Sequence, residues 1–177
     1  NGASTSADLQ TAGLESWLKD HPARDFVRIK EGTSWSCHHG VGRWTGTCEC
    51  TPGDRTWKQQ FWASMDRLAK TIDQIFLHET IGLTQNPWLL RDRYIHVILG
   101  QISFQDLLKE NRGRELSSLE ERKIHLLLEA EREKQRMFTS CGWFFDDFDR
   151  IEPCYNIAYA AQAVHLVKLA AGIDLEA

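Results

Sequence analysis

Apolar side chains recur every three or four positions along most of this chain, a spacing that places them on one face of an α-helix. The longest such stripe begins after Asp54 and continues to Gly82. Its apolar members are Trp57, Phe61, Met65, Leu68, Ile72, Ile75 and Phe76. The pattern therefore predicts one long amphipathic helix over this range.

Helix-capping residues mark two further helices after this stripe. Asn86 followed by Pro87 predicts a helix start, because Asn caps a first turn well and Pro fits its first position. Ser118 with Glu121 has the spacing of a capping box, in which the two residues bond each other's backbone. This box predicts a helix that continues to Phe138.

The remaining helices are predicted from weaker stripes and from composition. Loose apolar periodicity indicates short helices over residues 7–20 and 103–109. The last helix, predicted over residues 157–171, is rich in Ala and apolar nearly all round, as expected of a helix buried among others. Strand signals are almost absent, apart from a short extended piece predicted at residues 26–29.

These elements predict an all-α fold, a bundle of about five to six helices with one long ordered loop rich in Cys and Gly. A chain of 177 residues is within the range of one domain, so we assign residues 1–177 to a single helical domain. Within it, the loop takes residues 33–55 and the bundle takes residues 56–172. Because the chain begins at Asn1 rather than at Met, we expect it to be a C-terminal piece of a larger protein.

Charge, hydropathy and cysteine usage narrow the class of protein. A formal net charge of -4 argues against a nucleic-acid binder, whose surface needs clustered Lys and Arg. No apolar run approaches the roughly 20 residues that cross a bilayer, so we expect no membrane partner. Five cysteines are an odd number and too few for a disulfide scaffold, which favours a reducing compartment, the cytoplasm.

Thiol and imidazole side chains crowd into one short stretch of the loop. They are Cys37, His38, His39, Cys48 and Cys50. Soft thiolates and imidazoles this close in sequence point to a metal or a redox site, with zinc as the expected ion. A metal- or redox-responsive binding module is therefore one candidate function of the chain. Common zinc and iron–sulfur motifs space their ligands more widely, however. The alternative, a set of reduced cysteines that simply pack in the interior, therefore stays open.

The spacing of the cysteines indicates which donors can share one ion. Cys48 and Cys50 would present both sulfurs to the same side of an extended backbone, and Cys37 would approach from the other limb of the loop. Three sulfurs need a fourth ligand. His39 is the nearby candidate, and Cys141 is the long-range candidate that would tie the loop to the end of a helix.

Several blocks of sequence carry a resemblance to a known family. They are S-W-S-C-H-H-G-V-G-R-W, C-E-C, W-K-Q-Q-F-W, P-W-L-L-R-D-R-Y-I and T-S-C-G-W-F-F-D-D, which lie in this order between Trp35 and Leu166. Together they resemble the helical domain found C-terminal to glycoside hydrolase family 57 modules. The resemblance implies an accessory domain of a larger α-glucan-acting glycosidase or glycosyltransferase, whose N-terminal catalytic barrel is the missing partner. The family block has one His directly before the Gly, which favours His39 over His38 as a ligand.

The acidic residues near the last helix are the only catalytic candidates under this resemblance. Asp146 and Asp147 are adjacent, whereas the two carboxylates of a glycosidase lie about 5 to 9 Å apart and come from different elements. We therefore expect no catalytic residue in this chain. Asp146, Asp147 and Asp149 are instead predicted to be solvated or to cap the start of the last helix.

Tryptophan is abundant, with seven residues, and flat aromatic faces suit sugar rings. Trp35, Trp44 and Trp143 lie in loop-like blocks, so they are candidates to line a glucan groove; the alternative is packing around the cysteine loop. Arg43 is predicted to pair with Asp146 or Asp147. We expect these rare residue types to converge at one end of the bundle, with Cys141 beside the loop.

Overall fold

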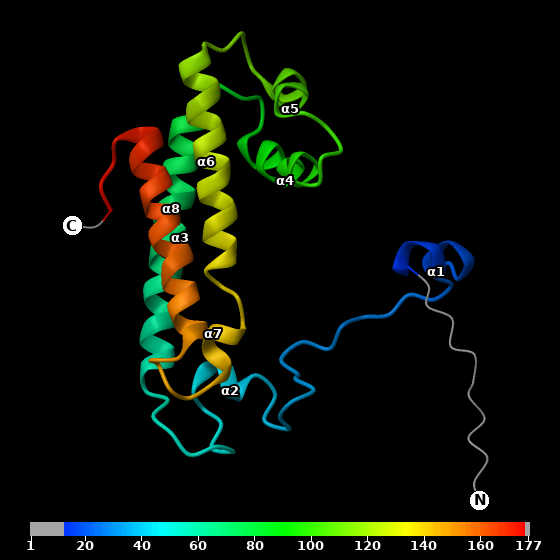
Figure 1. Cartoon of the computed structure of the whole chain (residues 1–177), viewed down its shortest axis with the longest axis vertical. Helices are drawn as coiled ribbons and strands as arrows, with labels where there is room; N and C mark the ends of the chain where they lie inside the picture. The colour runs from blue at the N-terminus through cyan, green and yellow to red at the C-terminus, as the bar shows by residue number, and fades with distance from the viewer. Residues whose placement is uncertain (1–12, 176–177) are drawn as a thin grey trace, which may run out of the picture. The chain divides into compact units, whose positions relative to one another are not determined.

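All regular elements of the structure are helices, which confirms the predicted all-α fold class (Figure 1). The computed structural model describes residues 13–175, and no strand occurs among them. None of the described helices is both long enough and apolar enough to cross a bilayer. The chain divides into two parts between Thr33 and Ser34, and each part is described by itself.

The N-terminal part contains one short helix, α1 (Leu14–Asp20). None of its side chains is buried, and Trp17 stacks on His21 with ring centroids 4.4 Å apart. The helix predicted here is confirmed within the described residues, and its residues 7–12 lie outside them. The extended piece predicted at residues 26–29 forms no strand, since no neighbouring segment pairs with it, and its apolar side chains are exposed.

Three long helices form the bundle: α3 (Trp57–Thr80), α6 (Ser118–Arg136) and α8 (Ile151–Ala171). They lie side by side along most of their length (Figure 1). The side chains buried between them include Ile72, Ala130, Ala163, Leu166 and Val167. Each fully buried Val, Leu or Ile contributes about 1.5–3 kcal/mol relative to an exposed one. The long stripe predicted from the sequence is therefore the packed face of α3, which contacts α6 and α8 along its middle and other helices at its two ends.

Two shorter helices, α4 (Pro87–Ile98) and α5 (Phe104–Asn111), pack at one end of the bundle (Figure 1). Asn86 caps α4, because its side-chain oxygen accepts the backbone N–H of Leu89 at 3.1 Å. Ser103 caps α5 in the same way. The core at this end consists of Phe76, Leu90, Tyr94, Leu107, Leu108, Ile124, Leu127 and Leu128. Both predicted helices are confirmed.

The capping box of α6 lies one residue earlier than predicted from Ser118 and Glu121. Ser117 Oγ accepts the backbone N–H of Glu120 at 3.4 Å, and the Glu120 carboxylate accepts the N–H of Ser117 at 2.8 Å. The run S-S-L-E-E allows two capping boxes, one from Ser117 to Glu120 and one from Ser118 to Glu121. The ion pair between Arg114 and Glu120 favours the first of these two. The hydrogen bonds from Arg114 and Ser117 lower the pKa of Glu120 to about 2.

The last helix begins at Ile151 rather than at the predicted Ile157. Pro153 lies in its first turn, where a proline is tolerated because the N–H it lacks would have no helical acceptor. The N-cap position is Arg150, which makes no capping hydrogen bond and pairs with Glu152 at 3.0 Å instead. None of the preceding aspartates is therefore the cap of this helix, and Asp147 and Asp149 are exposed, as the solvated alternative predicts.

Two one-turn helices, α2 (Gly42–Thr45) and α7 (Cys141–Phe144), pack together at the opposite end of the bundle from α4 and α5 (Figure 1). Trp143 of α7 is completely buried, and its ring centroid lies 5.0 Å from that of Phe61 and 4.9 Å from that of Trp62. This aromatic core closes the bundle beneath the cysteine loop.

Replacing Gly142 by Ala is expected to destabilise this end of the bundle. A Cβ at this position would lie 2.4 Å from Nδ2 of Asn156, a buried side chain that donates to the carbonyl of Thr139 at 3.0 Å. Overpacking of this kind costs about 1–3 kcal/mol. Urea unfolding should show such a loss for Gly142→Ala and none for Gly13→Ala, where nothing lies within 4 Å of the new Cβ. Equal stability of the two variants would contradict the close contact.

Candidate metal centre

The loop that carries the clustered cysteines is folded back on itself by α2, a helix that the sequence pattern did not predict. The carbonyl of Gly42 accepts the backbone N–H groups of Thr47 at 2.9 Å and of Cys48 at 3.1 Å. A side chain on Gly42 would be crowded, since its Cβ would lie 3.2 Å from the Cβ of Cys48. Gly46 ends α2 with a φ of 78°. These turns bring Cys48 back beside Cys37.

Four side chains of the loop gather into one group, which we call the Cys/His cluster: Cys37, His39, Cys48 and Cys50. The Sγ atom of Cys37 lies 3.3 Å from that of Cys48 and 3.8 Å from that of Cys50. The Nδ1 atom of His39 lies 3.4 Å from the sulfur of Cys37. The same nitrogen lies 3.6 Å from the sulfur of Cys48 and 3.3 Å from that of Cys50. Every sulfur therefore lies close to the imidazole.

These separations fit a tetrahedral ion. With metal–sulfur bonds of about 2.3 Å and metal–nitrogen bonds of about 2.0 Å, a tetrahedron places two sulfurs about 3.8 Å apart and sulfur and nitrogen about 3.5 Å apart. The measured separations of 3.3 to 3.8 Å agree with these values to within about 0.5 Å. The Cys/His cluster could therefore hold a metal ion.

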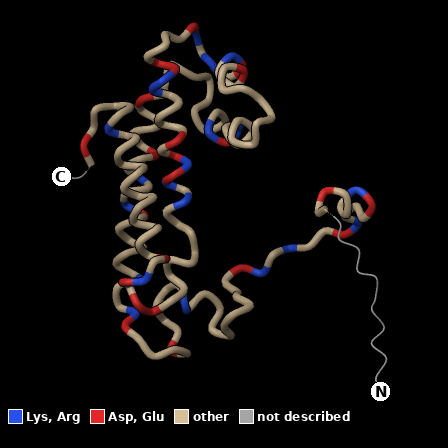
Figure 2. Tube along the Cα trace, viewed as in Figure 1, with Lys and Arg blue, Asp and Glu red and all other residues tan. Residues whose placement is uncertain are grey.

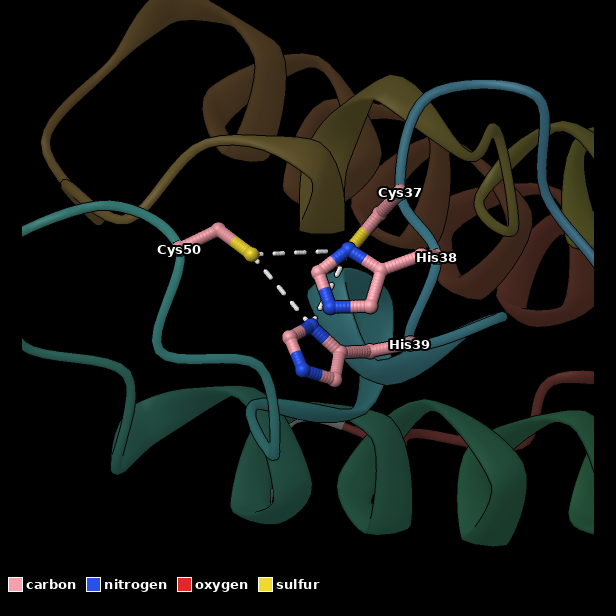
Figure 3. Close-up of side chains that lie close together, drawn as sticks. All are labelled: Cys37, His38, His39 and Cys50. Atoms are coloured by element: carbon pink, nitrogen blue, oxygen red, sulfur yellow. Dashed lines mark hydrogen bonds between the residues drawn. The ribbon is translucent and has the colours of Figure 1, made fainter.

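His38 also lies within reach of the cluster (Figure 3). Potential ligand atoms of Cys37, His38, His39 and Cys50 all lie within 4.8 Å of one another. The two imidazole rings pack together with centroids 3.8 Å apart. The sequence favours His39 over His38 as a ligand. Periodicity could not predict the position of the His38 side chain, because the backbone here is irregular. Its adjacency to His39 was the only signal.

Cys141 is the predicted donor that the structure does not place in the cluster. It is exposed at the start of α7, and its sulfur makes no hydrogen bond to the cluster among the described residues. The loop and the α7 region still meet, through Thr51, which follows Cys50, and Asp146, which follows α7. The contact between these two blocks thus includes the Asp146 carboxylate and does not include a fourth sulfur.

Hydrogen bonds shift the pKa values of two thiols of the cluster, Cys48 and Cys50, in opposite directions. The backbone N–H of Cys50 donates to Sγ of Cys48 at 3.4 Å and, with the side-chain hydrogen bonds around it, lowers the pKa of Cys48 to about 6. The hydrogen bond with Cys48 raises the pKa of Cys50 to about 11, and Cys37 acts in the same direction. One thiolate therefore forms readily at Cys48, whereas three thiolates together require a cation beside them.

Asp146 joins the loop to the bundle. Its carboxylate accepts hydrogen bonds from the hydroxyl of Thr51 and, at 3.1 Å, from the buried ammonium of Lys58. Its backbone carbonyl accepts the indole N–H of Trp57 at 2.7 Å. Burial acts to raise the pKa of Asp146, but the hydrogen bonds from Thr51 and Lys58 together outweigh it and lower the pKa. The carboxylate is thus held ionised between loop and bundle.

These contacts correct the predictions about the charged residues here. Asp146 bonds the loop and caps no helix, and Asp147 beside it is exposed. The partner of Asp146 is Lys58 and not Arg43. The guanidinium of Arg43 lies 4.7 Å from the ring centroid of Phe144, and its backbone carbonyl accepts the Lys58 ammonium at 2.7 Å.

Burial separates the three tryptophans predicted to contact sugar. Trp143 is completely buried, so its ring offers no face to a ligand. Trp44 is half-buried and meets Phe144 edge-on, with ring centroids 5.5 Å apart. Trp35, two residues before Cys37, is 96% exposed. Packing thus accounts for Trp44 and Trp143, whereas Trp35 remains available to a ligand.

The fold and the Cys/His cluster define a helical domain with a loop that could hold a metal ion. The chain belongs to the DUF3536 family, a domain of unknown function, whose family model matches residues 54–177. The Cys/His cluster lies just before this matched range. No curated protein and no solved structure matches the chain.

Replacing Lys58 by Met should destabilise the chain strongly, because it leaves the carboxylate of Asp146 without its cation. The Lys58 side chain is completely buried and that of Asp146 is 8% exposed, and breaking a buried pair costs about 3–5 kcal/mol. The matched control is Lys70→Met on the same helix, where Lys70 pairs with Asp66 at 2.7 Å in solvent and contributes about 0.5 kcal/mol or less. Similar urea midpoints for both variants would contradict the anchoring role of Lys58.

Proposed function

We propose that this chain is a zinc-binding helical domain in which the ion is held by the Cys/His cluster. The observation that carries the proposal is the set of sulfur and nitrogen separations, 3.3 to 3.8 Å, which match the edges of one coordination tetrahedron. Reduced cysteines that merely packed in a core would have no need of an imidazole nitrogen among them.

Zinc suits this donor set better than other ions. Three thiolates and one imidazole are the soft and borderline ligands that zinc takes in tetrahedral structural sites. Calcium and magnesium require oxygen ligands, and no carboxylate belongs to the cluster. Iron bound to the same sulfurs is the competing ion, and elemental analysis distinguishes the two.

The role of the ion would be structural. Four protein donors fill a tetrahedral site, whereas a catalytic zinc keeps one position open for water or substrate. The ion would hold both limbs of the loop together at Cys37 and Cys50. Because Thr51 directly follows Cys50, an ion bound at Cys50 would also hold the Thr51 hydroxyl in place to donate its hydrogen bond to Asp146. Metal binding would thereby contribute to folding free energy.

The zinc proposal predicts about one zinc per chain in protein purified without chelator. Cys48→Ser should abolish this binding and lower the melting temperature, because it removes a buried donor. The matched control is Cys154→Ser on α8, an exposed cysteine outside the cluster, which should keep both values unchanged. Mass spectrometry of the metal content and thermal scans measure the two quantities. Zinc or iron below about a tenth of an equivalent on the unaltered chain would contradict the proposal.

We propose, second, that the domain assists a catalytic module and does not catalyse alone. The resemblance to the domain that follows glycoside hydrolase family 57 modules suggests that partner, and suggests an α-glucan as the ligand. One observation favours a sugar contact: Trp35 is 96% exposed and lies two residues from the Cys/His cluster, which would hold it in place. Asp146, one of the two candidate acids, is already bonded to Lys58.

This second proposal predicts background hydrolysis of soluble α-glucans by the chain alone, together with measurable glucan binding. Trp35→Ala should weaken binding about two- to tenfold, by analogy with the about 0.5–1.5 kcal/mol that one aromatic contact contributes. Trp17→Ala, which removes another exposed tryptophan, is the control and should bind normally. Affinity electrophoresis in glucan gels measures the difference. Equal mobility of both variants, or turnover lost in Asp146→Asn, would overturn the proposal.

A further inference from the structure

The donors of the Cys/His cluster are divided between a buried and an exposed side. Cys37 is 8% exposed and Cys48 is 3% exposed, so both sulfurs lie inside the loop. Cys50 and His39 belong to exposed residues, and Figure 3 shows Cys50 reaching the group from the opposite limb of the loop to Cys37. An oxidant that arrives from solvent therefore meets the sulfur of Cys50 first. Oxidation of cysteine requires a thiolate as well as exposure, and the zinc ion of the loaded site would keep the Cys50 sulfur deprotonated.

The sulfur of Cys37 lies close enough to react with an oxidised Cys50. The Sγ atoms of Cys37 and Cys50 lie 3.8 Å apart, and a disulfide requires about 2.05 Å. Closing this gap needs a shift of less than about 2 Å in a loop that contains several glycines. Cys48 is a poorer partner for Cys50, because the two are separated by one residue and their disulfide would close a small, strained ring.

We propose that Cys50 is a site of oxidation by hydroperoxides, and that a Cys37–Cys50 disulfide then opens the metal site. In the first step the Cys50 thiolate attacks the terminal oxygen of the hydroperoxide; a sulfur–oxygen bond forms, the O–O bond breaks, and the departing alkoxide or hydroxide takes a proton from a buffer acid. In the second step the Cys37 thiolate attacks the sulfenic sulfur; the S–S bond forms, the S–O bond breaks, and the expelled hydroxide takes a proton from a buffer acid to become water. The two sulfurs lose two electrons and the peroxide gains them.

Release of the ion follows from the loss of donors. The disulfide removes Cys37 and Cys50 from the metal and leaves Cys48 and His39, with His38 nearby. Two or three donors no longer make a closed structural site, so zinc leaves the loop. This regulation rests on the proposed zinc site, and it would make the contact between loop and bundle sensitive to peroxide.

The experiment treats the zinc-loaded chain with hydrogen peroxide and follows two readouts. A chromogenic chelator records zinc release, and tryptic mapping locates the disulfide. Trypsin cuts after Arg43 and Arg55, so Cys37 falls in the peptide over residues 31–43, and Cys48 and Cys50 fall in the peptide over residues 44–55. Fragmentation should identify Cys50 as the linked residue, and a thiol reductant should restore zinc binding.

Cys50→His is the decisive variant, because it removes the reactive sulfur and keeps a zinc donor. It should bind zinc and release it to peroxide at least about tenfold more slowly than the unaltered chain. Cys141→Ser and Cys154→Ser, which alter exposed cysteines outside the cluster, should release zinc at the normal rate. A Cys37–Cys48 link, or unchanged release from Cys50→His, would overturn the proposal.

The zinc proposal and this one fail in different ways. A chain that carries no zinc before peroxide is added contradicts the zinc site, and the disulfide map of that chain still shows whether Cys50 pairs with Cys37. A chain that carries zinc and keeps it after Cys50 is oxidised to a sulfinic acid contradicts the regulation alone.

Discussion

The buried ammonium of Lys58 is the interaction on which the arrangement of this domain depends. A fully buried charge is stable only when other groups replace its water, and two segments remote in sequence from Lys58 supply them. The carbonyl of Arg43 in α2 accepts it at 2.7 Å, and the carboxylate of Asp146, after α7, accepts it at 3.1 Å. The cation thus joins α2, α3 and the segment before α8 at one point.

The Cys/His cluster and the ion pair between Lys58 and Asp146 hold the same loop through different contacts. The cluster joins one limb of the loop to the other, whereas Asp146 joins the loop to the bundle through Thr51 and Lys58. Figure 2 shows that acidic and basic residues both lie at this end of the bundle. Because Thr51 directly follows Cys50, the Cys/His cluster and the hydrogen bond to the Asp146 carboxylate are adjacent along the chain. The family match begins at residue 54, so the bundle belongs to the matched domain and the cluster lies on the segment that leads into it.

The sequence by itself determined the features that depend on neighbours along the chain. The apolar stripe of α3 and the Asn86 cap of α4 were both predicted correctly, since periodicity and capping involve residues within one or two turns. The proximity of Cys37, His39, Cys48 and Cys50 was also predicted, because a short loop keeps its own residues close. Whether an ion occupies them remains a prediction.

Only the tertiary structure decided the features that depend on residues far apart. The pairing of Asp146 with Lys58 rather than with Arg43, the burial of Trp143 and the exposure of Cys141 all follow from how α7 packs against α3 and α8. Local propensity allowed the acid to be a helix cap and the tryptophan to be a surface residue. The buried Lys58 cation decided between these alternatives, because a charge removed from water needs an anion beside it. Asp146 supplies that anion, and no pattern along the chain shows which segment will do so.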